Sequence, residues 1–191
     1  MVAFDWNMAK QEFRRALDVA RFHPDAMDFV ARHASLNRNA AIFIALASLA
    51  GAVGSLLFPL REGRVSYSPT IVEALFNAGM AVLLIGLVLF LLNGIAERVF
   101  RAPSDFGSFF RVVGYGYVVG FLNVVPALRV LTSLWVIVLI IQVLMRVKRL
   151  SLPQAVISLV FLSLLLFVVF VLFQGLNPAN LYGGLYFSPT L

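Results

Sequence analysis

The sequence predicts an all-α membrane protein, a bundle of five transmembrane helices preceded by an amphipathic N-terminal helix. Hydrophobic residues make up 61% of the chain and charged residues only 13%, which is too little polar surface to cover a soluble domain. Five apolar segments each approach the roughly 20 residues that a helix needs to cross a hydrocarbon core. The basic residues are also distributed unequally between the segments that connect these five.

The distribution of basic residues predicts the orientation of the five spans, which are Ala40–Leu60, Ile71–Ile95, Phe109–Leu128, Val130–Val147 and Pro153–Phe173. If the connecting segments alternate between the two membrane faces, 12 of the 15 Lys and Arg residues lie on the side of the N-terminus. By the positive-inside rule this side is cytoplasmic. We therefore expect a multi-pass protein of a cell membrane, with a cytoplasmic N-terminal region (1–38), a membrane domain (39–175) and an extracytoplasmic interfacial tail (176–191).

The N-terminal region reads as a helix outside the bilayer. Trp6 and Phe13 belong to an apolar stripe at helical spacing, whereas Arg14 and Arg15 lie on other faces of the cylinder. Such a helix can anchor at the membrane interface by binding anionic lipid, or it can dock a partner protein. It can also simply pack under the membrane bundle, and the sequence leaves these alternatives open.

Proline and small polar residues mark the remaining boundaries. Pro24 ends the first pattern because it lacks a backbone donor, and a second short helix follows in which Asp28 and Arg32 are spaced for an i,i+4 pair. The third and fourth spans join almost directly through 126–129, which predicts a tight antiparallel hairpin. Ser151 and Pro153 form a typical start signal for the fifth span.

Small residues at helical spacing predict where helices approach closely in lipid. Ala47, Gly51 and Ser55 are four residues apart in the first span, and Gly116 and Gly120 form a GxxxG motif in the third. These faces can pack within one chain or form a homo-oligomer.

Polar residues within or beside the spans are the candidates for a functional site, because burying them in lipid is expensive. They are Glu73, Asn77, Asn123, Gln142 and Arg129. Glu73 and Arg129 are expected on the same face of the membrane and can form a structural pair. Arg111, near the basic face, is expected to extend to the lipid headgroups.

Motifs of enzyme chemistry are missing from the sequence. There is no cysteine, and His23 and His33 are accompanied by no HExxH motif or acidic cluster, so we expect no metal site and no cofactor. No Gly-x-Ser-x-Gly, Ser-x-x-Lys or phosphate-binding Gly-rich loop occurs. The basic residues follow the edges of apolar spans, which argues against nucleic-acid binding.

A resemblance to a known family begins at Gly107. Residues 107–156 contain a Gly-Ser-Phe entry, an aromatic residue and Arg before a Gly-Tyr pair, and a proline-containing hairpin. Trp135 then follows early in the next span, before a basic end and Leu-Ser-x-x-x-Ala. This segment, together with the five-span layout, resembles the Yip-domain (Ypt/Rab-interacting protein) family, in its short prokaryotic-like form. The chain departs from the family in lacking a proline soon after the tyrosine and in lacking an extended cytoplasmic region of the kind that engages GTPases.

The resemblance implies a non-enzymatic membrane scaffold or assembly protein that binds other membrane proteins or lipids. The alternative is a small transporter or channel subunit that uses the polar residues of spans two to four. An intramembrane hydrolase is a third and weaker interpretation, because no nucleophile–base pair is visible.

Overall fold

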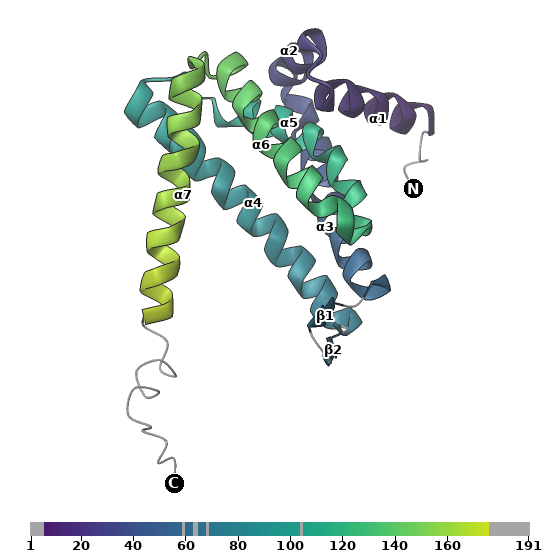
Figure 1. Ribbon diagram of the computed structural model, residues 1–191. Coiled ribbons are helices and arrows are strands. Elements are labelled where there is room, and N and C mark those ends of the chain that lie inside the picture. Colours follow the sequence, from purple (N-terminus) through teal and green to yellow (C-terminus); the bar gives the residue numbers. More distant parts are fainter. Residues whose placement is uncertain (1–5, 59, 63–64, 68, 104, 176–191) are drawn as a thin grey trace.

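The computed structural model describes residues 6–58, 60–62, 65–67, 69–103 and 105–175, and the predicted tail 176–191 lies outside them. Within these ranges the secondary structure is helical apart from one short hairpin (Figure 1). The α-helices are α1 (Trp6–Ala20), α2 (Pro24–Arg32), α3 (Asn37–Leu57), α4 (Ile71–Phe100), α5 (Phe106–Gly116), α6 (Arg129–Arg146) and α7 (Leu152–Gly175). The 3₁₀ helices are η1 (Ala34–Leu36), η2 (Tyr117–Val124) and η3 (Pro126–Leu128). Strands β1 (Leu60–Glu62) and β2 (Val65–Tyr67) pair antiparallel, with Arg61 opposite Ser66.

Four segments are long and apolar enough to cross a membrane within the described residues: Ala34–Leu57, Ile71–Phe100, Pro126–Arg146 and Leu152–Val171. They correspond to the first, second, fourth and fifth predicted spans, and they identify the chain as a candidate multi-pass membrane protein. Large apolar side chains point outward along all four, as expected where lipid replaces water as the solvent.

The third predicted span has a different structure. The α-helix α5 ends at Gly116, and the chain continues as the 3₁₀ helix η2. A regular third membrane helix is therefore not confirmed. The segment carries three glycines, which have low helix propensity, so contacts with neighbouring helices decide its local conformation. Most residues of α5 are buried.

Close contacts define the direction of each segment within the bundle. Gly114 lies against Ala40 and Gly120 against Ala47, so α5 and η2 run parallel to α3. α6 runs the opposite way, since Gly116 in α5 lies against Leu139 in the second half of α6. We call the end of the bundle that holds the α6–α7 connection and α2 the α2 end, and the opposite end, which holds β1 and β2, the hairpin end (Figure 1).

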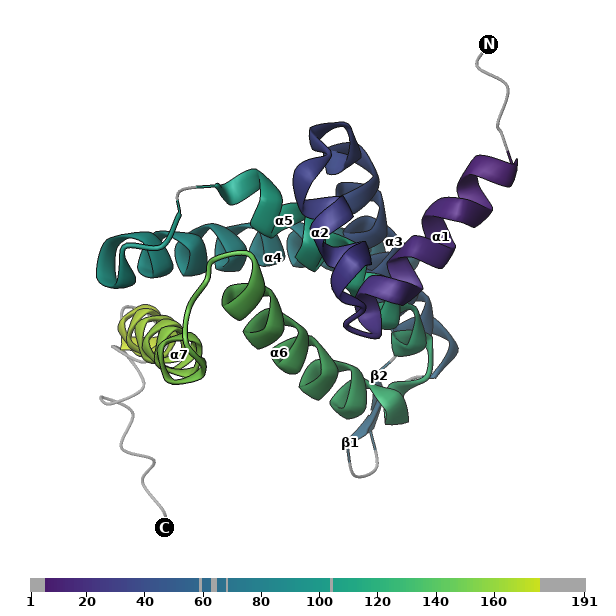
Figure 2. The same ribbon diagram turned by 90° about the horizontal axis from the view of Figure 1, so that it is seen from above.

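The helices α1 and α2 pack on the side of the bundle formed by α5, and α1 also contacts η2. The helix α7 lies at the opposite edge from α1 (Figure 2). It contacts α4 and α6 through its first half, where Ala155, Ser158 and Leu162 are buried. From there α7 diverges from α4 (Figure 1). Most of its side chains up to Val171 are exposed.

Candidate functional site

A cavity of about 350 Å³ opens between α3, α4, η2 and the start of α6. It brings together three of the polar residues singled out by the sequence, Asn77 from α4, Asn123 from η2 and Arg129 from α6. Two hydroxyl-bearing residues of α3, Ser48 and Ser55, add further polar groups to its wall. The cavity thus combines several polar groups with a largely apolar wall, between helices whose outer surfaces are apolar.

The α3 wall of this cavity consists of small residues. Ala47, Gly51 and Ser55, the predicted packing stripe, all line the cavity, and the space in front of them is therefore partly open. The tight contact between α3 and the α5–η2 segment uses a row of α3 seven residues apart, formed by Ala40, Ala47 and Gly54, which shares only Ala47 with the predicted stripe. A Cβ atom on Gly54 would lie 2.5 Å from the carbonyl oxygen of Val124, so the backbones of α3 and η2 are in direct contact at this position.

The two glycines of the GxxxG motif contact different neighbours within the same chain. A Cβ atom on Gly120 would lie 2.8 Å from the Cβ of Ala47 in α3. A Cβ atom on Gly116 would overlap a methyl carbon of Leu139 in α6. Both glycines therefore serve intramolecular packing, which is one of the two alternatives that the sequence left open.

Arg129 and Asn123 are held in place by hydrogen bonds at the cavity. The Arg129 guanidinium donates to the carbonyl oxygen of Gly51 at 3.0 Å and to that of Asn123 at 3.4 Å. The Thr132 hydroxyl donates to the side-chain oxygen of Asn123. Glu73 instead caps the N-terminus of α4, where it accepts from the backbone N–H of Thr70 at 2.7 Å. Glu73 and Arg129 thus have separate partners, and each stabilises the end of a different helix.

Two of the predicted polar residues are not part of the cavity wall. Glu73 lies at the start of α4, and Gln142 is exposed on α6. The sequence could not separate these from Asn77 and Asn123, because its hydropathy pattern gives the depth of a residue and not the side of the helix that faces the bundle.

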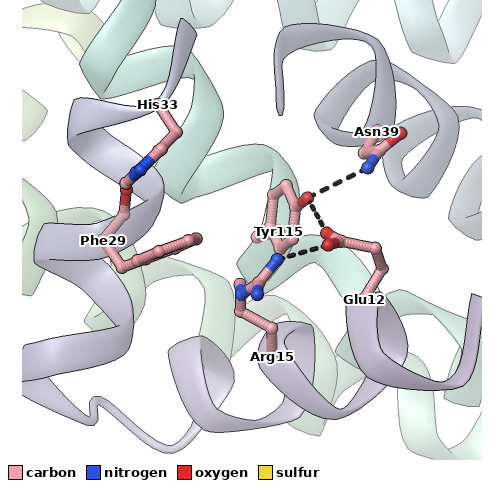
Figure 3. A network of polar contacts seen from close by, with 6 residues as sticks. All are labelled: Glu12, Arg15, Phe29, His33, Asn39 and Tyr115. Atoms are coloured by element: carbon pink, nitrogen blue, oxygen red, sulfur yellow. Dashed lines mark hydrogen bonds and ion pairs between the residues drawn. The ribbon is translucent and has the colours of Figure 1, made fainter. Parts of the chain in front are cut away.

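A second polar cluster joins α1 to α5 and α3. The Tyr115 hydroxyl donates to Glu12 and accepts from the Asn39 amide at 3.3 Å (Figure 3). Arg15 pairs with the same Glu12 carboxylate and lies over the ring of Phe29, 4.3 Å from its centroid. Tyr115 is fully buried, so these bonds satisfy a hydroxyl that has no access to water.

The predicted interfacial residues of α1 have several environments. Trp6 is 71% exposed, and Arg14 is exposed as well. Phe13 stacks against Phe121 of η2 with a centroid distance of 6.2 Å, and Arg15 takes part in the Tyr115 cluster. Trp6 and Arg14 can contact lipid, whereas Phe13 attaches α1 to η2 and Arg15 attaches it to α2.

Arg111 is the residue whose role the sequence prediction missed. Its side chain does not extend to headgroups, because it is only 5% exposed. Its guanidinium donates to the carbonyl oxygens of Val30 and Ala31 and to the side chain of Asn37. These carbonyls belong to the last turn of α2, where the helix itself supplies no donor, and that of Ala31 also accepts from the Ser108 hydroxyl at 2.7 Å. Arg111 therefore caps α2 from a position 80 residues away in the chain.

The end of α6 forms a further connection to α2. Arg146 donates to both carboxylate oxygens of Asp28, at 2.9 and 2.8 Å. The expected Asp28–Arg32 pair is therefore replaced by a two-bond pair with α6, and Arg32 acts on Asp28 only through longer-range attraction. The hydrogen bond from Arg146 lowers the pKa of Asp28 below its ordinary value.

Among the described residues, no group of three or more His, Asp or Glu side chains lies close enough together to hold a metal ion. No family model, curated protein or solved structure matches the chain. The resemblance to the Yip-domain family consequently remains a prediction, and the function has to be argued from the residues of this chain.

Proposed function

We propose that the protein is a five-span membrane scaffold or assembly protein that binds other membrane proteins or lipids and catalyses no reaction. Four of the five crossings are the long apolar helices α3, α4, α6 and α7. The proposed third crossing is α5 followed by η2. At about 1.5 Å per residue for α5 and about 2.0 Å for η2, its length is about 32 Å, comparable to a hydrocarbon core of about 30 Å.

The direction of the segments supports a cytoplasmic N-terminus and an extracytoplasmic C-terminus. α3 and the α5–η2 segment run toward the hairpin end, and α6 returns to the α2 end. The basic residues Arg98, Arg101, Lys148 and Arg149 lie at or beyond the ends of α4 and α6, and both helices end toward the α2 end. The positive-inside rule then makes the α2 end cytoplasmic.

The observation that carries the scaffold proposal is the second half of α7. Between residues 163 and 171 only Leu166 is partly buried, and Phe167 and Phe170 are 63% and 59% exposed. The apolar residues of α7 are distributed around the whole helix, and α7 diverges from α4 in this half (Figure 1). Large apolar side chains are exposed on both helices. A transmembrane helix of another protein could pack there without displacing any contact of the bundle.

Site-specific photocrosslinking in native membranes tests this proposal. A photoreactive amino acid at Phe167 or Phe170 should yield the same discrete protein adduct, identified by mass spectrometry. Phe76 on α4, which is 67% exposed, provides the control position. If all three positions yield lipid adducts only, the open face of α7 binds lipid and the assembly role is wrong.

The second candidate function is a small transporter or channel subunit, favoured by the cavity that contains Asn77, Asn123 and Arg129. Tracer flux into liposomes is the deciding measurement. If the cavity conducts a solute, Asn77→Leu should abolish flux, whereas Gln142→Leu, outside the cavity, should leave it unchanged. Equal flux in protein-free and protein-containing liposomes would dismiss this candidate.

A further inference from the structure

A second and larger cavity lies at the α2 end, on the outside of the bundle. This cleft of about 810 Å³ is bounded by α2, the loop before α5, the start of α5 and the end of α6. Its charged lining residues are Asp28, Arg32, Asp105, Arg111, Arg146 and Arg149. Four arginines against two aspartates give this lining a formal charge of +2.

Both carboxylates of the cleft are already engaged in bonds. Asp28 accepts two hydrogen bonds from Arg146. Asp105 caps α5 by accepting from the backbone N–H and the hydroxyl of Ser108. Desolvation opposes its ionisation, but these bonds and the nearby Arg111 and Lys148 outweigh it and lower the pKa of Asp105. The carboxylates are therefore charged at neutral pH and committed to structural contacts.

Two of the four arginines remain available to a ligand. Arg111 is buried and caps α2, and Arg146 is paired with Asp28. Arg32 and Arg149 are exposed, and in the described part of the chain neither guanidinium makes a hydrogen bond or an ion pair. Their side chains come from α2 and from the connection after α6, and both line the same cleft. Two free guanidinium groups of this kind can contact one anion together.

The backbone at Arg149 supports a role for its side chain. Arg149, just beyond the end of α6, has the left-handed conformation with φ of 55°, and the N–H of Leu150 donates to the carbonyl oxygen of Leu144 in α6 at 3.2 Å. Glycine is the usual residue at this position, because a side chain costs about 1–2 kcal/mol there. Adjacent Lys148 is buried and donates to the carbonyl oxygen of Pro103 at 2.7 Å, which fixes the end of α6 against the loop before α5.

We infer that this cleft binds a phosphate-bearing anion, with Arg32 and Arg149 as its main contacts. Guanidinium groups recognise phosphate through paired, charge-assisted hydrogen bonds, and the cleft is within the size range of small-molecule sites. Because the proposed orientation places the α2 end at the cytoplasmic headgroup level, the anion can be the headgroup of an anionic lipid. A soluble phosphate compound offers the same chemistry. The inference does not depend on whether α7 binds a partner protein.

Binding measurements on the full-length protein in detergent test the site. The probes are phosphatidic acid, phosphatidylcholine and inorganic phosphate, with lipid retention followed by native mass spectrometry. The variant R32Q/R149Q removes two charges from the cleft, and R14Q/R38Q removes two exposed charges elsewhere in the N-terminal half of the chain. We expect R32Q/R149Q to weaken phosphatidic acid binding about tenfold, equivalent to one charge-assisted hydrogen bond. R14Q/R38Q should remain within about twofold of the unmodified protein.

A second variant separates binding from folding. R149G replaces arginine by the residue that the left-handed position favours, so the protein should be at least as stable as before while binding phosphatidic acid more weakly. Preferential retention of phosphatidic acid that inorganic phosphate does not displace supports a lipid site. Displacement by inorganic phosphate at millimolar concentration, sensitive to R32Q/R149Q, supports a site for a soluble phosphate compound. An equal loss in both double variants, or equal retention of both lipids, would overturn the inference.

Discussion

At the scale of single residues, Arg111 is the side chain on which the attachment of α2 to the bundle depends most. One guanidinium contacts two carbonyl oxygens of α2, the side chain of Asn37 and the hydroxyl of Ser108. A planar, permanently charged group with five donors can satisfy such a set of acceptors, and a lysine ammonium cannot.

Replacement of Arg111 should therefore destabilise the protein strongly. We expect Arg111→Gln to lower the free energy of unfolding by about 3 kcal/mol or more, because several buried acceptors lose their donor at once. Thermal denaturation in detergent measures the effect, and hydrogen exchange should show faster exchange in α2. Arg14→Gln, at an exposed position of α1, is the matched control. If both variants melt at the same temperature, the capping role of Arg111 is wrong.

Replacement of Asn93, in contrast to that of Arg111, should stabilise the protein. Asn93 is 6% exposed in α4, and its side-chain oxygen has no hydrogen-bond partner among the described residues. A buried acceptor without a donor costs about 1–3 kcal/mol. Asn93→Leu, which is similar in volume, should therefore raise the melting temperature of the purified protein. A lower melting temperature would show that this oxygen has a partner that leucine cannot replace.

At the scale of elements, α3 and the α5–η2 segment are in close contact along much of their length. Gly54, Gly114 and Gly120 all lie where an added Cβ would be closer than 3.0 Å to a neighbouring atom. By contrast, Gly86 on α4 has no neighbour within 4 Å of an added Cβ. These positions therefore form a matched pair for a packing experiment.

Gly54→Ala should destabilise the protein, whereas Gly86→Ala should leave its stability unchanged or raise it. The first substitution forces α3 away from the backbone of η2, at a cost of about 1–3 kcal/mol. The second adds helix propensity of about 1 kcal/mol at an open position. Both effects can be read from thermal denaturation in the same detergent. Equal tolerance at the two positions would contradict the close approach of α3 and η2.

The connection between α2 and α6 should depend on pH. Since Arg146 lowers the pKa of Asp28, the pair stabilises the fold at pH above the ordinary aspartate value of 3.8, and this contribution is lost as the pH falls through the lowered pKa. Both side chains are about 40% exposed, so the contribution is below about 1 kcal/mol. Melting curves at pH 6 and pH 3 should differ less for Asp28→Asn than for the unmodified protein. An identical pH dependence in both proteins would exclude the pair as its source.

The sequence predicted some elements well and others poorly, for identifiable reasons. Long apolar runs located four helices, since crossing length and composition are local properties. Pro24 likewise predicted the start of α2. The 3₁₀ helix η2, the capping of α2 by Arg111 and the Asp28–Arg146 pair all depend on residues far apart in the chain. No periodicity within one segment can reveal such contacts.

The residues of the candidate site were likewise predicted only in part from the sequence. Asn77, Asn123 and Arg129 could be identified from polarity alone, and the structure brings them to one cavity. Nothing in the sequence indicates that Gln142 is exposed outside the cavity, or that the stripe of Ala47, Gly51 and Ser55 borders an open space. The cleft at the α2 end was missed because its arginines come from 32 to 149 in the chain.

At the scale of the whole molecule, the central claim is that the chain crosses the membrane five times. This claim depends on the third crossing, because α5 and η2 do not form one continuous membrane helix. If this segment crosses, the short connection at Ala127 lies on the opposite side from the N-terminal region. If it does not cross, Ala127 lies on the same side as that region.

Labelling of single cysteines in intact cells or oriented vesicles by an impermeant thiol reagent measures this directly, since the chain contains no cysteine of its own. Ser35 and Ala127 are both exposed and can each be replaced by cysteine, and Ser188 reports the C-terminal tail. Five crossings predict that the cysteines at Ala127 and Ser188 are labelled from outside and the cysteine at Ser35 only after permeabilisation. Labelling of the cysteines at Ser35 and Ala127 from the same side would contradict the five-span account.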